Sequence, residues 1–581
     1  MLFPSDQTLA GANENTAFIL LTWEELFSQE TPDSYQPKLL NIPALLEELK
    51  LTSIRAKRHK KWERHVKKIQ EELKAECEAE QNILVKVPRL QWGLQSLVTE
   101  ENYAEIPSLI KLIWLNVPDY ESLTTDAFFE AISRLPRAKY DTIQAIRRVA
   151  TVAVRKEFSK EDFEHLFVDE NFKKTPAEIG KSIIEIINSV KKQYTCIVAV
   201  KGKTEDLQVV GRRAGFSLLG QHHLPTDDKG REFLAKTNGN VWLSIKVEAV
   251  NRVKAIQSAI RNVRPAIDIF NFYKYDALSL CDDVLIIDSD SKSFLLNLQQ
   301  RWHWHLANRK NTTRLTKSLI SDGLEKKDRF NGVLNALEHY SLSQVNAASR
   351  VRLVNLWSAL ECLTTSDDKD SIISAVCNAV VPLVAWRRTA KILSYTSKNL
   401  LELKRLTGKG LGAGFPLEEA GLPNERLILA LSKAEHDPSP EQLQVFSKQH
   451  PVLGFRVFSL WQSFSSPKDL AVELKSSAMR TEWHLYRIYR ARNLIVHEGT
   501  EVPHANLLLG NLHYYFRVTM SRILHGMGMH ENWGVDDSIE YWKSRYNYII
   551  DELEKNQGKS LEVFDFLPII KQDFKKKKIW G

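Results

Sequence analysis

The spacing of apolar and polar residues along the chain predicts regions of different structure. In residues 1–192 apolar residues recur at helical spacing, so this N-terminal region is expected to be mostly helical. The expected helices are 42–50, 106–114, 125–134, 140–154 and 176–192. Residues 193–312 predict an α/β module, because short β-branched runs there alternate with a helical segment. The expected strands are 195–200, 207–210, 241–247 and 283–288, with a helix at 252–273.

Helical spacing returns in residues 325–530 and predicts a helical bundle, which a C-terminal extension with a basic tail follows at 531–581. The helices expected in the bundle are 330–340, 345–363, 372–395, 425–433, 453–465, 470–497 and 506–525. Pro382 is expected to interrupt the third of these, because proline removes a backbone donor. The predicted fold class is therefore multidomain and mainly α.

The end of the helix expected at 470–497 groups polar residues with an apolar stripe. Gly499 follows the last periodic residue and predicts the end of this helix. Asn493 and His497 are separated by four positions and so lie on one helical face, with Arg492 beside them. A histidine can exchange a proton near neutral pH, and an arginine fits phosphate oxygens with its planar fork. Together they could cleave RNA without a metal, with Asn493 orienting the phosphate or the imidazole.

A simpler interpretation of this segment is structural. A histidine at the end of a helix often interacts only with the helix dipole. A second feature favours a catalytic role over a structural one, namely the single carboxylate of Glu361 in the apolar stretch 353–363. A carboxylate in such surroundings is costly unless it is paired, and Arg492 or His497 are its expected partners.

On these two segments, residues 328–525 resemble a HEPN domain of the Apea-like branch found in bacterial defence proteins. The block from Arg492 to His497 resembles the signature of that family, and the helix that ends near Glu361 resembles a second recurring segment. The resemblance implies a helical bundle that forms a homodimer, with both segments lining one cleft. It also implies a metal-independent endoribonuclease that needs no cofactor and acts in anti-phage defence by abortive infection.

The resemblance also implies roles for individual residues. His497 would be the general acid or base, Arg492 would bind the scissile phosphate, and Asn493 and Glu361 would support orientation. Arg487 and Arg490 are spaced to add positive charge beside the cleft. A dimer would supply the second histidine that attack by a 2′-hydroxyl group requires, and the product would carry a 2′,3′-cyclic phosphate. The N-terminal regions would sense a trigger, such as a phage-derived one, or restrain the nuclease.

Other function classes remain open. A non-catalytic HEPN-like module could hold nucleic acid, a nucleotide or a protein partner. A metal-dependent DNA nuclease is disfavoured, because no carboxylate cluster with metal-ligand spacing lies near the signature. The aspartates Asp282, Asp283, Asp288 and Asp290 lack a fixed ligand pattern, and the alternating Trp302–His305 segment favours a surface strand over a metal site.

Composition agrees with a globular protein: 43% of the 581 residues are hydrophobic and 26% are charged. The net charge of +8 is compatible with binding to nucleic acid. The five cysteines are scattered, which fits a reducing cytoplasm. The start of the chain lacks the pattern of a signal peptide, and the longest apolar run, 372–386, is too short and too interrupted to span a membrane.

Charged and glycine-rich segments complete the sequence. The basic run 55–68 could bind nucleic-acid phosphates with Trp62 free to stack, but a solvated helix with charge pairs is the favoured interpretation. The glycine-rich segment 407–416 has no P-loop ending and predicts a connector. The basic tail 573–581 could contact nucleic acid or remain solvated.

Overall fold

The computed structural model divides the chain into two units. One unit comprises Met1–Thr151, Leu166–Gly180 and Asn308–Gly581, and the other comprises Val152–His165 and Lys181–Ala307. Within them the structure describes residues 12–27, 41–115, 117–156, 158, 160–201, 215–220, 224–274, 278–297, 327–345, 348–364, 372–407, 450–463, 466–499, 502, 505–530 and 532–556. The predicted fold class is confirmed: the chain is mainly α, with a small antiparallel sheet in the middle of the sequence.

Some predicted features lie outside the described residues. These are the strand 207–210, the Trp302–His305 segment, the glycine-rich stretch after residue 407, the helix 425–433 and the basic tail.

The first unit begins with a series of helices. They are α2 (Glu14–Phe27), α3 (Ile42–Ala56), η1 (Lys60–Trp62), α4 (Glu63–Ala79), α5 (Gln81–Leu84), α6 (Pro88–Thr99), α7 (Ile106–Trp114), α8 (Val117–Ser133), α9 (Lys139–Arg155), α10 (Asp169–Phe172) and the first residues of α11 (Pro176–Ile187). Most of η2 (Lys160–Leu166) and the rest of α11 belong to the second unit. Local sequence explains several starts, since the Asn41 side chain accepts from the Ala44 N–H and proline opens α6. The apolar faces of α3, α4, α6 and α7 form one core, which includes Trp62.

The C-terminal helices of the same unit form the bundle. They are α16 (Lys327–Val345), α17 (Ser349–Cys362), α18 (Ile372–Thr407), α21 (Pro451–Ser463), α22 (Pro467–Glu498), α23 (Ala505–Met529) and α24 (Val535–Lys555). All of these except α21 contribute to one apolar core, and α21 contacts the core helices α18 and α22. Helix α18 continues through Pro382, so the interruption expected there is wrong. Val380, Leu383 and Val384 are buried in that core, and this packing holds the helix together where proline removes one hydrogen bond.

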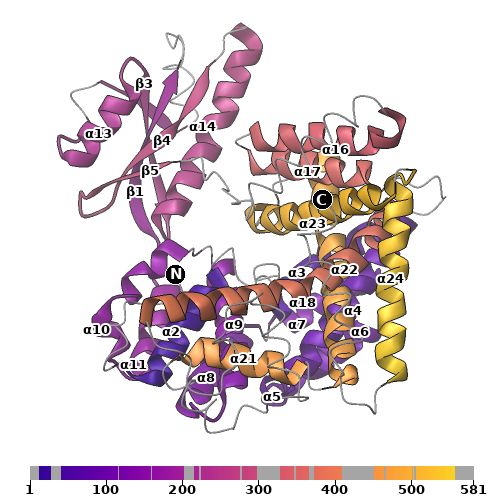
Figure 1. Cartoon of the computed structure of the whole chain (residues 1–581). Helices are drawn as coiled ribbons and strands as arrows, with labels where there is room; N and C mark the ends of the chain where they lie inside the picture. Colours follow the sequence, from indigo (N-terminus) through magenta and orange to yellow (C-terminus); the bar gives the residue numbers. More distant parts are fainter. Residues whose placement is uncertain are drawn as a thin grey trace. The chain divides into compact units, whose positions relative to one another are not determined.

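Segments far apart in the sequence pack together in this unit. In Figure 1 the indigo helices of the N-terminal region lie among the orange helices of the bundle. Glu25 of α2, which is 1% exposed, pairs with Arg456 of α21, and the rings of Phe18 and Phe455 meet edge to face. Helix α24 also belongs here, since the Trp542 indole donates to the Arg522 carbonyl of α23. The N-terminal helices and the bundle therefore form one body, although the sequence analysis drew a boundary between them.

The second unit is built on a sheet with the strand order β2-β3-β1-β4-β5, all neighbours antiparallel. The strands are β1 (Lys192–Lys201), β2 (Phe216–Leu219), β3 (Val241–Ala249), β4 (Ser279–Ile287) and β5 (Ser293–Asn297), with helices α13 (Asp228–Thr237) and α14 (Arg252–Lys274). Side chains of β1 alternate between two cores. Cys196 and Val198 meet α14, whereas Ile197 shares a core with Phe233 of α13, so the two helices cover opposite faces (Figure 1).

The predicted strands within 195–200, 241–247 and 283–288 are confirmed, while β2 and β5 were not predicted.

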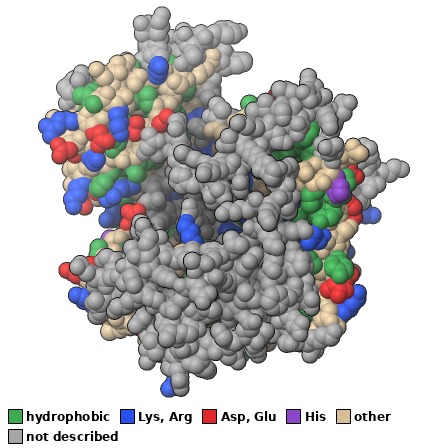
Figure 2. All heavy atoms as spheres, viewed as in Figure 1, with side chains coloured by type: hydrophobic (Ala, Val, Ile, Leu, Met, Phe, Trp, Pro, Cys, Tyr) green, Lys and Arg blue, Asp and Glu red, His purple; other side chains and the backbone are tan. Residues whose placement is uncertain are grey.

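The surface of α13 carries acidic and basic side chains intermixed, at the upper left of Figure 2. Lys229 and Lys236 both pair there with Glu232.

All five cysteines are free thiols. Among the helices that the structure describes, none combines the length and the apolar character that crossing a membrane requires.

Candidate active site

Helix α22 carries the signature residues near its C-terminal end. The helix begins where the Ser466 hydroxyl accepts a hydrogen bond from the Asp469 N–H, with Pro467 in the first turn. It ends at Gly499, whose φ of 59° lies in the left-handed region and whose N–H donates to the Leu494 carbonyl. The prediction that Gly499 terminates the helix is therefore confirmed.

The predicted catalytic residues lie on the last two turns of α22, and two of them are in contact. Arg492 and Asn493 are partly buried, and the Arg492 Nη1 donates to the Asn493 Oδ1 at 3.1 Å. His497 is exposed and makes no hydrogen bond or ion pair with any residue that the structure describes. It lies five residues after Arg492, a rise of about 7.5 Å along the helix. The imidazole is thus open to solvent one to two turns beyond the guanidinium.

Glu361 of α17 completes this group. One of its carboxylate oxygens lies 3.8 Å from the Arg492 Nη2, and the other accepts a hydrogen bond of 2.6 Å from the Trp357 indole. The prediction that Glu361 requires a charged partner is confirmed, and the partner is Arg492. The ring of Trp357 also packs against Tyr489 of α22, with 5.4 Å between ring centroids. These contacts fix the carboxylate on one side of the arginine.

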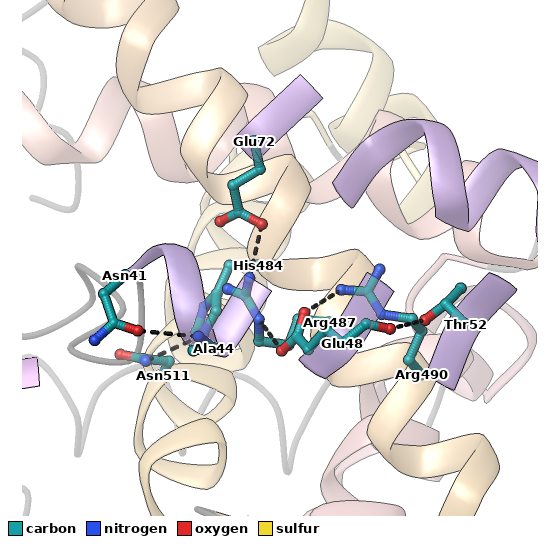
Figure 3. Close-up of polar contacts among 9 residues, drawn as sticks. All are labelled: Asn41, Ala44, Glu48, Thr52, Glu72, His484, Arg487, Arg490 and Asn511. Atoms are coloured by element: carbon teal, nitrogen blue, oxygen red, sulfur yellow. Dashed lines mark hydrogen bonds and ion pairs between the residues drawn. The ribbon is translucent and has the colours of Figure 1, made fainter. Parts of the chain in front are cut away.

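Arg487 and Arg490 do not lie at an open cleft. Their side chains are 4% and 7% exposed, and both point from α22 toward helices of the N-terminal region (Figure 3). The Arg487 Nε donates to Glu48 of α3 at 2.6 Å and its Nη2 donates to Glu72 of α4 at 2.7 Å. The Arg490 Nη2 donates to the other Glu48 oxygen at 2.9 Å. The expectation that these arginines add charge beside the cleft is therefore wrong, because two carboxylates bind them away from solvent.

In this buried cluster, burial and the charge of the ion-pair partner shift each pKa in opposite directions. Burial raises the pKa of the Glu48 carboxyl, but the charges of Arg487 and Arg490 outweigh it, so that pKa lies below its ordinary value. Glu72 is 1% exposed, and there burial prevails over the attraction of Arg487 and raises the pKa. Burial lowers the pKa of Arg490, while Glu48 and Glu72 hold the pKa of Arg487 above its ordinary value despite burial. The cluster is a structural ion-pair network.

Other histidines near α22 are buried. His484 is 1% exposed, with its Nδ1 2.9 Å from the Tyr515 hydroxyl and its Nε2 3.3 Å from the Asn511 amide. Burial, followed by the charges of Arg487 and Arg490, holds the pKa of His484 well below its ordinary value. The neutral ring of His484 is a packing residue, whereas His497 of the same helix is open to solvent.

Helices α3 and α4 contact the signature end of α22 directly. Arg55 donates two hydrogen bonds, of 2.9 and 2.7 Å, to the carboxylate of Glu498, the residue that follows His497. His65 stacks on Tyr489, with 5.7 Å between ring centroids, and Lys68 lies 3.2 Å from Glu482. The basic run 55–68 is therefore neither an arm with a free tryptophan nor a wholly solvated helix, because Trp62 is buried and α4 packs on α22.

The sequence holds a signal for these contacts in two carboxylates that stand beside apolar residues. Glu48 follows Glu47 and precedes Leu49 in the apolar stretch of α3, and Glu72 precedes Leu73 among the buried residues of α4. The reasoning that demanded a partner for Glu361 applies equally to both carboxylates.

The aspartates of the second unit are used in local structure. The Asp288 Oδ1 accepts from the backbone N–H groups of Asp290 and Lys292, and Asp283 lies 3.7 Å from Lys236. Within the part of the chain that the structure describes, no group of three or more histidine, cysteine, aspartate or glutamate residues is placed to hold a metal ion.

No protein-family model matches this chain, and neither a curated protein nor a solved structure matches it. The candidate site is accordingly defined by its own residues. They are an exposed histidine and a partly buried arginine on one helix end, an adjacent amide, and a carboxylate that holds the arginine.

Proposed function

We propose that this chain is a metal-independent endoribonuclease whose active site lies at the C-terminal end of α22. The observation that supports this most is the placement of His497, exposed on the same helix end as Arg492 while Glu361 holds that arginine from the facing helix. An exposed imidazole and an oriented guanidinium on the same helix end provide a proton carrier and a phosphate ligand.

The arrangement leaves Arg492 able to bind a phosphate. Its distance of 3.8 Å from Glu361 is longer than a hydrogen bond, so the carboxylate orients the guanidinium while N–H donors stay available. Arg492 would donate to the non-bridging oxygens of the scissile phosphate and stabilise the negative charge of the phosphorane. Asn493, which already accepts from Arg492, would steady the same group.

In this mechanism the 2′-oxygen of ribose attacks the phosphorus and the 5′-oxygen of the next nucleotide leaves. His497 would take the proton of the 2′-hydroxyl group, and a second histidine would supply a proton to the leaving oxygen. The products would be a 2′,3′-cyclic phosphate and a free 5′-hydroxyl group. Since each chain offers one signature histidine, the proposal includes a homodimer that brings two copies of His497 to one substrate.

The biological setting belongs to the proposal as well. On the HEPN resemblance, we propose that such a nuclease acts in the cytoplasm of a bacterium, in abortive infection, with a phage-derived trigger. Helices α3 and α4 contact α22 through Arg55 and through the buried cluster, so they are the segment by which a trigger would reach the site.

Cleavage of RNA in EDTA tests the proposal. Wild type, His497→Ala and the control His165→Ala would be incubated with total RNA, with and without extract of phage-infected cells. His165 is also an exposed histidine but belongs to the unit that contains the sheet. Loss of a general acid or base should lower the cleavage rate of His497→Ala by about a hundredfold or more, whereas the control should cleave like wild type.

The ends of the fragments identify the chemistry. Products with 2′,3′-cyclic phosphates that depend on His497 would support the nuclease. Equal cleavage by wild type and His497→Ala would remove His497 from the mechanism. RNA binding without cleavage under every condition would instead favour the non-catalytic binding module.

A further inference from the structure

The connection between α3 and α4 has a surface that is mostly positive. Residues 57–67, called the basic turn here, contain a single carboxylate, Glu63, and many cationic side chains. The exposed lysines and arginines of the basic turn are Lys57, Arg58, Lys60, Lys61, Arg64 and Lys67. Apart from Arg64, none of these makes an ion pair or hydrogen bond through its side chain with any residue that the structure describes. A surface helix normally offsets such charges within itself, as α13 does.

The basic turn is held in a fixed shape by its apolar residues. Trp62 and Val66 are buried in the core of the N-terminal helices. The guanidinium of Arg55 lies 5.6 Å from the centroid of the Trp62 ring, and the guanidinium of Arg64 lies 5.8 Å from that of Tyr486. The cationic side chains therefore project from an anchored backbone, which reduces the conformational entropy that a ligand must remove on binding.

The same contacts place the basic turn beside the signature end of α22. Arg55, two residues before Lys57, binds Glu498, and Glu498 is the neighbour of His497. Adjacent Cα atoms are about 3.8 Å apart, so the backbone of Lys57 lies within about 8 Å of that of Arg55. The uncompensated cations thus begin two residues after an arginine that binds the sequence neighbour of His497.

We infer that the basic turn binds the phosphate backbone of the RNA strand whose scissile phosphate reaches His497 and Arg492. The inference rests on the proposed function and assigns to the N-terminal region a part of the substrate surface. Lysine ammonium groups act as point charges on phosphates, so recognition by the basic turn is independent of base sequence. A lipid surface fits less well, because the basic turn buries its own tryptophan and valine rather than presenting them to a membrane.

A triple substitution tests the surface. Lys57→Gln, Lys60→Gln and Lys61→Gln would be combined in the full chain, and all three side chains are exposed. Binding would be measured with a single-stranded 2′-O-methyl RNA of about 20 nucleotides, which lacks the attacking hydroxyl group and is long enough to span such a site. Substitutions at exposed positions like these change stability by about 0.5 kcal/mol or less, so the variant should fold.

A matched control removes the same charge elsewhere. Lys468→Gln, Lys475→Gln and Lys555→Gln alter exposed lysines as well. Along α22, Lys475 is about 33 Å from His497 and Lys468 is farther, given the rise per residue of a helix. Lys475 pairs with Glu554, which places the end of α24 at that same distant end.

The basic-turn variant should bind the RNA at least about tenfold more weakly than wild type, and the slope of log affinity against log salt should fall by about 2. The control should retain both values. Equal affinity and equal salt slope in the basic-turn variant would overturn the inference. It would also be overturned if the variant lost binding only to phosphatidylserine vesicles and kept full RNA binding.

The cleavage assay reports separately on the proposed function. RNA binding that depends on Lys57, Lys60 and Lys61 without cleavage would support this surface and reject the nuclease. Cleavage that depends on His497, together with RNA binding that does not depend on the three lysines, would support the nuclease and reject this surface.

Discussion

Helix α22 presents basic residues in two contrasting environments within its last four turns. Arg487 and Arg490 are buried and share the carboxylates Glu48 and Glu72. Arg492 is 21% exposed, its only carboxylate partner among the described residues is Glu361 at 3.8 Å, and His497 is open to solvent. Arginines of one helix therefore lie in different surroundings within two turns.

The contrast follows from what covers each face of the helix. Helices α3 and α4 pack over the face that carries Arg487, and removal of water there makes charge pairing obligatory. The end of the helix is covered less, so His497 is exposed and Arg492 is partly exposed. Charge pairing at the first site stabilises the fold, whereas the pairing of Arg492 at the second is longer and partly exposed.

The largest expected effect comes from breaking the buried cluster. Arg487→Ala leaves the Glu72 carboxylate, which is 1% exposed, without its main partner. The free energy of unfolding of the larger unit should fall by about 3–5 kcal/mol, as is usual when one member of a buried ion pair is removed. Urea unfolding followed by tryptophan fluorescence would measure it.

Arg492→Ala is the matched control on the same helix. Because its pairing with Glu361 is long and partly exposed, the loss should be about 1 kcal/mol or less. Similar losses for the two variants would contradict the distinction between a structural and a functional arginine.

Lowering the pH should also destabilise the buried face of α22. Burial, with the charges of Arg490, Arg64 and Lys61, lowers the pKa of His65 to about 3 in the folded protein. In the unfolded chain the pKa of a histidine is about 6.5, so between these values the unfolded state binds more protons. The stability that neutral His65 contributes is complete above about pH 6.5 and is lost toward about pH 3, at up to about 1.4 kcal/mol per pH unit.

His65→Phe should reduce this dependence while keeping a ring against Tyr489. The measurement is the free energy of unfolding at several pH values for wild type and variant. The part of the slope that remains would come from other buried histidines such as His484, whose pKa is lowered by burial too. Superimposable pH profiles would show that His65 does not contribute.

The smallest expected effect concerns the end of the helix. Gly499 has a φ of 59°, and a Cβ there would meet nothing within 4 Å, so Gly499→Ala costs only backbone conformational energy. The expected loss is about 1 kcal/mol. Thermal unfolding would detect it, and Gly499→Asn should lose less, because asparagine tolerates the left-handed region. A loss as large as that of Arg487→Ala would mean that the cap supports more than the last turn.

Local pattern alone predicted much of the fold. The helix expected at 106–114 is α7 residue for residue, and the one expected at 470–497 is α22 apart from its first turn. Gly499 as the helix end and Arg492 as a partner of Glu361 were also predictable, because each depends on residues within one helix or on an unpaired carboxylate in an apolar stretch. Helix α24, with its polar face and late position, was not predicted.

The sequence by itself determined where α22 begins and ends and that Arg492, Asn493 and His497 share its last turns, because helix periodicity and capping act over a few residues. Only the tertiary structure decided that Arg487 and Arg490 are buried while His497 is exposed. Their partners Glu48 and Glu72 are more than 400 positions away in the chain, at separations of 439 and 415 from Arg487. Burial is a property of what packs on a helix face, and periodicity within one helix does not specify which distant helix that will be.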